Sequence, residues 1–152
     1  MIKRIIDSKI KERLFKGKAI ILMGSRQIGK TTSLKEIFSS DDKVLWLSGD
    51  DSDTQSFFEE ITSDRLKLLF GKKSIIVIDE AQRINNIGLK LKLITDNIDD
   101  LQLVVTGSSA FELADRTKEP LTGRKWEYQM FPLSFQEMVE HHGFITERRL
   151  IP

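Results

Sequence analysis

The chain has 152 residues, of which 39% are hydrophobic and 31% are charged, and its formal net charge is +1. This length suits about one domain with a buried core, and the near-neutral charge does not support binding to nucleic acid or to an anionic membrane. The absence of cysteine excludes disulfides, thiolate metal sites and cysteine nucleophiles. No apolar run is long enough to cross a bilayer and no signal peptide is evident, so we expect a cytoplasmic protein.

Apolar runs alternate with amphipathic stretches along the chain. We expect, in order, a helix over 2–16, a strand over 19–23, a helix over 30–38, a strand over 44–47, helical stretches around 57–61 and 66–70, a strand over 74–78, a helix over 87–98, a strand over 101–105, a helix over 110–116, a weaker strand over 126–131 and a helix over 134–141. This alternation predicts βαβ units and an α/β fold, a parallel sheet with helices on both faces. The loops at the carboxyl ends of such strands form the ligand crevice.

The first strand is followed by a motif that binds phosphate. Residues 24–31 read G-S-R-Q-I-G-K-T, which matches G-x-x-x-x-G-K-[ST] at every fixed position. Backbone N–H groups of such a loop point at a phosphate, and the helix that follows adds its positive end. Lys30 then reaches the β- and γ-phosphates, and the Thr31 hydroxyl ligates magnesium. The predicted nucleotide-binding residues are Gly24, Ser25, Arg26, Gln27, Ile28, Gly29, Lys30, Thr31 and Thr32.

The alternative for this segment is a glycine turn that happens to contain Lys-Thr, and the strand before it and the helix after it argue against that alternative. The side chain of Arg26 either contributes to the loop or points to solvent and pairs with an acid.

The third strand ends in two carboxylates, Asp79 and Glu80. Asp79 is placed to hold magnesium near Thr31, and Glu80 to orient or deprotonate an attacking water, which is what phosphoryl transfer to water requires. An N-cap acid followed by a solvated glutamate is the structural alternative. The phosphate-binding loop upstream favours the catalytic interpretation, because the two motifs support each other.

Three segments together resemble the AAA-domain ATPases of archaea and bacteria, of the additional-strand, catalytic-glutamate branch of P-loop proteins. They are residues 24–32, residues 75–82 (IIVIDEAQ) and residues 104–109 (VVTGSS); residues 121–124 (LTGR) and 131–135 (FPLSF) resemble the subgroup whose AAA domain precedes a C-terminal domain of uncharacterised function. The resemblance implies a three-layer αβα sandwich and a five-stranded parallel sheet of order 5-1-4-3-2. We therefore expect 1–152 to be one AAA-type ATPase core, the N-terminal part of a longer protein, without a small helical lid or a second sensor arginine.

The resemblance also implies roles for individual residues. Thr106 and Ser108 would lie near the γ-phosphate, Thr106 as a polar sensor, whereas a helix-capping role is the alternative for Ser108 and Ser109. Gln82 would contact the γ-phosphate or the lytic water, or be a solvated helix residue. Arg124 would be directed at the phosphates, serve a neighbouring subunit of a homo-oligomer, or form a surface ion pair. The N-terminal helix would wall the adenine pocket.

These observations favour ATP/ADP and Mg²⁺ as ligands and slow ATP hydrolysis through Lys30, Thr31, Asp79 and Glu80, with Thr106 and Arg124 as further catalytic candidates. A nucleotide-dependent switch with little hydrolysis is the alternative. A small-molecule kinase would need an acceptor-site motif, and a GTPase would need an Asn/Thr-Lys-x-Asp signature after a late strand; neither is present.

Overall fold

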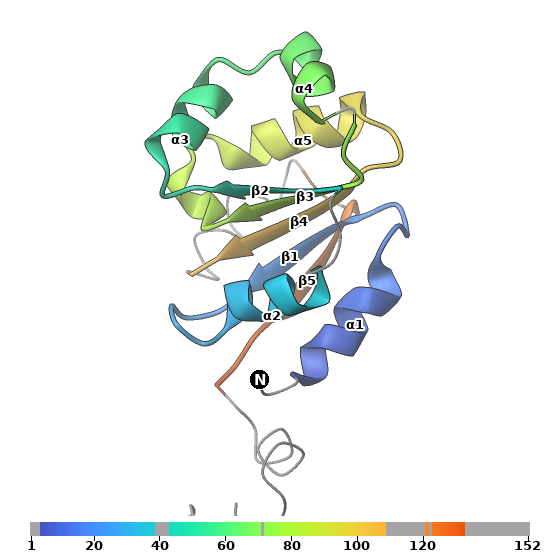
Figure 1. Ribbon diagram of the computed structural model, residues 1–152, viewed down its shortest axis with the longest axis vertical. Coiled ribbons are helices and arrows are strands. Elements are labelled where there is room, and N and C mark those ends of the chain that lie inside the picture. The colour runs from blue at the N-terminus through green and yellow to red at the C-terminus, as the bar shows by residue number, and fades with distance from the viewer. Residues whose placement is uncertain (1–3, 39–42, 71, 109–120, 122, 133–152) are drawn as a thin grey trace, which may run out of the picture.

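The computed structural model describes residues 4–38, 43–70, 72–108, 121 and 123–132. Its strands are β1 (Ala19–Met23), β2 (Val44–Ser48), β3 (Ile75–Asp79), β4 (Gln102–Gly107) and β5 (Lys125–Gln129). Its helices are α1 (Ile5–Arg13), α2 (Lys30–Ile37), α3 (Ser52–Glu59), α4 (Ser63–Phe70), the 3-10 turn η1 (Ala81–Arg83) and α5 (Ile87–Asn97). The sheet lies between α3, α4 and α5 on one face and α1 and α2 on the other (Figure 1), which confirms the three-layer α/β prediction.

The strands form one parallel sheet in the order β2-β3-β4-β1-β5. Read from the other edge, this is the order 5-1-4-3-2 that the family resemblance implies. The strand that carries Thr106 therefore lies between the loop strand β1 and the acid strand β3. Leu22 pairs with Thr106 and Ile78 pairs with Val105, so β1, β3 and β4 end at the same level.

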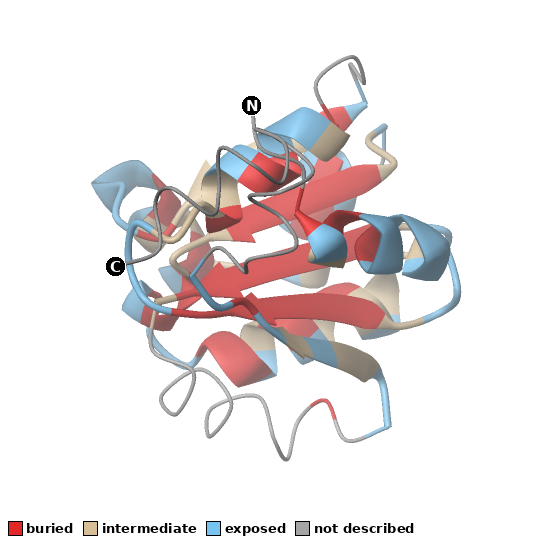
Figure 2. Cartoon of the chain, turned by 90° about the horizontal axis from the view of Figure 1, so that it is seen from below, coloured by how far each residue is buried: buried red, intermediate tan, exposed pale blue. Residues whose placement is uncertain are grey.

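The core is divided into two halves by the sheet. Successive residues of a strand face opposite sides, so Ile20 and Leu22 of β1 pack with Leu34 of α2, whereas Ile21 packs with Phe58 of α3 and the apolar side of α4 and α5. All five residues of β1 and all six of β4 are buried. Figure 2 shows the central strands of the sheet as continuously buried, whereas the edge strands β2 and β5 are only partly buried. The wholly apolar strand segments are thus explained by cover on both faces.

The structure adjusts several predicted boundaries. The fourth strand runs on to Gly107, so Thr106 lies within it, and η1 follows Glu80 where no helix was predicted. The predicted helices over 110–116 and 134–141 and the residue Ser109 lie outside the described residues. Within the described ranges, no helix is both long and apolar enough to cross a membrane.

Candidate nucleotide-binding site

Four polar segments meet where the parallel strands end. The loop 24–31 follows β1, Gly49 follows β2, Glu80 follows β3, and Ser108 follows β4. Because the sheet is parallel, the carboxyl ends of its strands share one edge. Residues up to 84 positions apart in the sequence therefore lie close together at this edge of the sheet, which we call the rim.

The conformation of the phosphate-binding loop depends on its glycines and on Lys30. Gly29, the residue before α2, has a φ of 99°, and Gln27 has a φ of 64°, so the loop uses left-handed backbone that favours glycine. A Cβ on Gly24 would collide with the Ile28 side chain and lie 2.6 Å from the Met130 carbonyl oxygen. The close approach of neighbouring backbone therefore requires glycine at position 24.

Lys30 is the buried cation of the loop. Its Nζ donates to the carbonyl oxygens of Gly24 (2.7 Å) and Ser25 (2.8 Å), and the residue is only 4% exposed. Burial lowers the pKa of Lys30, while the nearby carboxylates of Glu80 and Asp79 act in the opposite direction. A buried ammonium that is not fully compensated interacts strongly with an anion such as phosphate.

A hydrogen-bonded chain joins the loop to the two strands beside it. Thr31 Oγ1 donates to Asp79 Oδ2 at 2.8 Å. Thr106 Oγ1 donates to Asp79 Oδ1 and accepts from the Glu80 N–H at 3.0 Å. Thr106 is completely buried, so its hydroxyl connects the two acidic residues from within the sheet. The predicted residues Thr31 and Thr106 are thus both in direct contact with the predicted residue Asp79.

Glu80 is held by its own backbone and by Gln82. Its φ of 51° and ψ of 47° are left-handed, which costs a non-glycine residue about 1–2 kcal/mol. Gln82 Nε2 donates to Glu80 Oε2 and to Ser108 Oγ, each at 2.7 Å. Gln82 is 6% exposed, so it is not a solvated helix residue. It bridges the Glu80 carboxylate to the end of β4.

The oxygen atoms at this rim suit magnesium. Mg²⁺ prefers oxygen ligands and is commonly held by one or two carboxylates together with phosphates, and the Thr31 hydroxyl and Asp79 carboxylate lie side by side next to the loop. Within the described part of the chain, no three His, Cys, Asp or Glu residues gather into a metal cage. The donor set therefore fits a metal that arrives with a nucleotide.

Gly49 is a site residue that the sequence analysis missed. Its N–H donates to the Asp79 carbonyl oxygen at 2.7 Å, and a Cβ there would collide with the Glu80 carbonyl oxygen. The next residue, Asp50, lies 3.7 Å from the Arg26 guanidinium and 3.5 Å from that of Arg83. Arg26 is thus half-exposed and paired with an acid. The polar turn at 48–51 after the second strand was the available signal.

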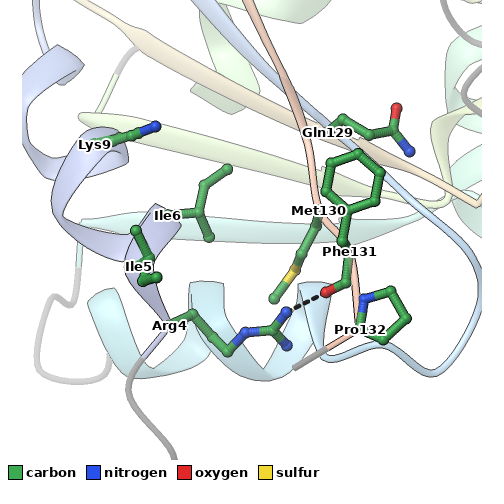
Figure 3. Close-up of a pocket in the computed structure, with 8 residues that line it drawn as sticks. All are labelled: Arg4, Ile5, Ile6, Lys9, Gln129, Met130, Phe131 and Pro132. Atoms are coloured by element: carbon green, nitrogen blue, oxygen red, sulfur yellow. Dashed lines mark hydrogen bonds between the residues drawn. The ribbon is translucent and has the colours of Figure 1, made fainter. Parts of the chain in front are cut away.

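Arg4, near the N-terminus, is a second residue that the sequence did not single out, and it is only 8% exposed. Its guanidinium donates to the Ile28 carbonyl oxygen of the loop (2.7 Å) and to that of Phe131. Beside it lies a cavity of about 280 Å³ between α1 and the end of β5 (Figure 3). The cavity is mostly apolar and is lined by Arg4, Ile5, Ile6, Lys9, Gln129, Met130, Phe131 and Pro132.

Arg124 lies at the opposite end of the sheet. It directly precedes β5, its carbonyl oxygen accepts from the Ala19 N–H at 2.9 Å, and its guanidinium pairs with Asp96 of α5. Ala19 and Lys125 are paired first residues of their strands, so Arg124 sits at the amino ends of the strands. This placement contradicts the expectation that Arg124 points at the phosphates of its own chain. Its role toward a neighbouring subunit stays a prediction.

The sheet order, the loop and the acidic pair together define a P-loop NTPase in which an additional strand separates the loop strand from the acid strand. A family model described as AAA domain matches residues 16–139, and the chain belongs to this family. This confirms the resemblance that the three segments of the sequence carry, and the family implies nucleotide binding.

The chain is also similar to individual proteins. It is 29% identical over 136 residues to the uncharacterized protein MJ1637 of Methanocaldococcus jannaschii, covering 80% of this chain and 28% of the relative. The fold matches the Walker-type ATPase PABY2304 of Pyrococcus abyssi (16% identity, TM-score 0.60, 100% of this chain and 60% of that one). It also matches domain III of the replication initiation protein DnaA from Thermotoga maritima (15% identity, TM-score 0.62, 95% and 73%). The chain spans little more than a quarter of the length of the curated relatives that it matches.

Proposed function

We propose that this domain binds ATP with magnesium and hydrolyses it slowly to ADP and phosphate. The observation that carries the proposal is the contact between the loop and the acidic pair, in which Thr31 donates to Asp79 at 2.8 Å. Loop and acid are far apart in the sequence, and their juxtaposition beside the buried Lys30 supports a common phosphate and metal site.

Each residue has a distinct part in the proposed reaction. The loop amides and Lys30 bind the β- and γ-phosphates, and Thr31 and Asp79 hold magnesium. Magnesium, when bound, neutralises charge on the phosphate oxygens. Glu80 orients a water whose oxygen bonds to the γ-phosphorus as the bond to the β–γ bridging oxygen breaks, and it accepts the proton of that water. Thr106 positions Asp79 and Glu80 through its hydrogen bonds to the Asp79 carboxylate and the Glu80 N–H.

The cavity in Figure 3 is the proposed place for the adenine base. It adjoins the loop, because Met130 Cε lies 3.8 Å from the Cβ position of Gly29. Ile5 and Phe131, which line it, are 42% and 66% exposed. An apolar slot with exposed flat or branched side chains suits a stacked purine. Competition of bound ATP by GTP tests this choice, and a clear preference for GTP contradicts it.

The alternative is a switch that binds ATP or ADP without appreciable hydrolysis. It uses the same loop, Thr31 and Asp79 and differs only in that Glu80 does not activate water. As the relatives extend well beyond the matched region, we propose that the domain serves a longer polypeptide or a homo-oligomer in either case.

Two measurements test the proposal. Calorimetric titration of Mg-ADP should show binding to the wild type and its loss in Lys30→Ala; equal affinity in both proteins contradicts the site. Single-turnover hydrolysis of labelled ATP by wild type and Glu80→Gln separates enzyme from switch. Faster phosphate release by the wild type supports hydrolysis, and equally slow release by both supports the switch.

A further inference from the structure

Arg4 is a buried cation that the proposed reaction does not use. It lies 24 positions before Ile28 and 127 before Phe131, yet its guanidinium donates to the backbone carbonyl oxygens of both residues. Figure 3 shows the side chain reaching from the start of α1 toward Phe131. Burying a guanidinium is costly unless charge-assisted hydrogen bonds compensate for the loss of water. Because burying this guanidinium costs free energy, a role of Arg4 beyond packing is expected.

The contact with Ile28 determines how one peptide group of the phosphate-binding loop is oriented. A trans peptide is planar, with its C=O and N–H pointing in opposite directions, and the described residues contain no cis peptide bond. Because the Ile28 carbonyl points at Arg4, the N–H of Gly29 points away from Arg4. The carbonyls of Gly24 and Ser25, by contrast, accept from Lys30. The guanidinium and the ammonium thus hold different carbonyls of the same loop.

Arg4 is itself anchored to the helix that follows the loop. Its N–H donates to Asp7 Oδ2 at 3.2 Å, and the Ser33 hydroxyl interacts with the Asp7 carboxyl. The Ser33 N–H in turn donates to the Gly29 carbonyl oxygen at 2.9 Å. The start of α1 therefore supports the Ile28–Gly29 peptide from one side and the first turn of α2 from the other.

The contact with Phe131 adds a second chain segment. The Met130 N–H donates to the Met23 carbonyl oxygen at 2.7 Å, immediately before the loop begins at Gly24. Residues 130–131 therefore run beside the entry of the loop, and the guanidinium of Arg4 spans from them to the loop's far end. The planar guanidinium, which has five N–H donors, can bind two separate carbonyl oxygens at once. A lysine ammonium is a compact point charge and suits this arrangement less well.

We propose that Arg4 is a positioning residue for phosphate recognition, which orients the Gly29 N–H toward a bound phosphate by fixing the Ile28 carbonyl. The inference rests on the proposed nucleotide site. Arg4 contacts no phosphate in this scheme; it acts through the backbone of the loop. Because Arg4 also lines the cavity proposed for the base, its loss should weaken the binding of ligands that carry phosphates clearly more than the binding of adenosine.

The test compares Arg4→Gln and Arg4→Lys with Lys16→Gln. Lys16 follows the same helix, is exposed and does not line the cavity in Figure 3, so its variant removes one positive charge without touching the loop or the proposed base site. Affinities for Mg-ADP and for adenosine are measured on each folded protein. We expect both Arg4 variants to lower the affinity for Mg-ADP by about tenfold or more, because one or two charge-assisted hydrogen bonds are lost. Adenosine affinity should fall clearly less than Mg-ADP affinity in both Arg4 variants, and both affinities of the control should stay within about twofold of the wild type.

Other outcomes overturn the inference. Unchanged Mg-ADP affinity in Arg4→Lys or Arg4→Gln contradicts it, and so does an equal loss for Mg-ADP and adenosine, which indicates general damage to the fold. If Arg4→Gln does not fold, the inference is tested by the Mg-ADP affinity of Arg4→Lys and by the amide NMR shift of Gly29. That shift should move on ADP addition to the wild type and much less in Arg4→Lys. Failure of the wild type to bind Mg-ADP contradicts the nucleotide site itself, which is a distinguishable result.

Discussion

Thr31 and Asp79 are 48 residues apart in the sequence, and the hydroxyl of the first donates a 2.8 Å hydrogen bond to the carboxylate of the second. Thr31 lies in the first turn of α2 and Asp79 at the end of β3. The contact exists because β1, β4 and β3 are parallel and end at the same level. Thr106 of β4, between the other two strands, binds the other Asp79 oxygen. The two predicted metal ligands therefore form a pair before any ion is considered.

The first prediction concerns this pair. Thr31→Val removes the hydroxyl at nearly constant volume, so magnesium should no longer strengthen ADP binding. We expect the ratio of ADP affinities with and without Mg²⁺ to fall by about tenfold or more, in line with a hydrogen bond to a charged group. Thr32→Val is the matched control for the ratio, because Thr32 is predicted to bind the nucleotide and not the metal. Its variant should change both ADP affinities alike and leave the ratio unchanged. Isothermal titration with and without EDTA measures the ratio, and an unchanged ratio in Thr31→Val contradicts the assignment.

The second prediction concerns Gln82. Replacing it by Leu removes the amide that joins Glu80 to Ser108 and leaves the loop intact. ATP affinity should stay within about twofold while the single-turnover rate falls by about tenfold, because general-base catalysis depends on the position of the base. Arg83→Gln in the same turn serves as the control, since Arg83 is half-exposed and pairs only loosely with Asp50. A rate equal to that of the wild type argues that Glu80 is positioned without Gln82.

The third prediction concerns Gly49. A methyl group there would collide with the Glu80 carbonyl, so Gly49→Ala should lower the free energy of unfolding by about 1–3 kcal/mol, as overpacking does. Asp50→Ala in the same turn should change it by less than about 1 kcal/mol, because both of its ion pairs are about half-exposed. Urea unfolding measures both values. Similar stability of the two variants contradicts the close approach.

The fourth prediction concerns pH. Burial raises the pKa of Asp7, against the opposing effects of the Arg4 N–H, the Ser33 hydroxyl and the charges of Arg4 and Lys11. A carboxyl whose folded-state pKa is raised binds its proton more tightly in the native state, so its contribution to stability is fully present below the unfolded pKa of about 3.8 and is lost as pH rises through the folded pKa.

Asp7→Asn cannot titrate. The melting temperature of the wild type relative to this variant should therefore be higher near pH 4 than near pH 7. Parallel curves of melting temperature against pH for the two proteins contradict the raised pKa.

The fifth prediction concerns Arg124. Because it lies at the amino ends of the strands and pairs with Asp96, Arg124→Ala should leave ADP affinity within about twofold of the wild type. Its exposed ion pair should contribute no more than about 1 kcal/mol to stability. A role in a neighbouring subunit requires that hydrolysis per molecule rises with protein concentration in the wild type and not in Arg124→Ala. Concentration-independent hydrolysis in both proteins removes that role.

The order of the elements and the two main motifs could be predicted from local patterns of residues. The apolar run 19–23, the loop 24–31 and the strand that ends at Asp79 are contiguous patterns, and short-range sterics and periodicity suffice to interpret them. The strand order came from the resemblance to a family, because no local pattern states which strands are neighbours.

Only the tertiary structure decided which side chains meet. Arg4 reaches Ile28 and Phe131, Thr106 reaches Asp79, and Arg124 lies far from the loop because sheet order and helix packing set these distances. Such contacts join residues tens of positions apart, and their geometry follows from how the layers pack rather than from any neighbouring residue in the sequence. Gly49 illustrates the same limit, since its requirement for a hydrogen side chain arises from the carbonyl of Glu80, which follows the adjacent strand β3.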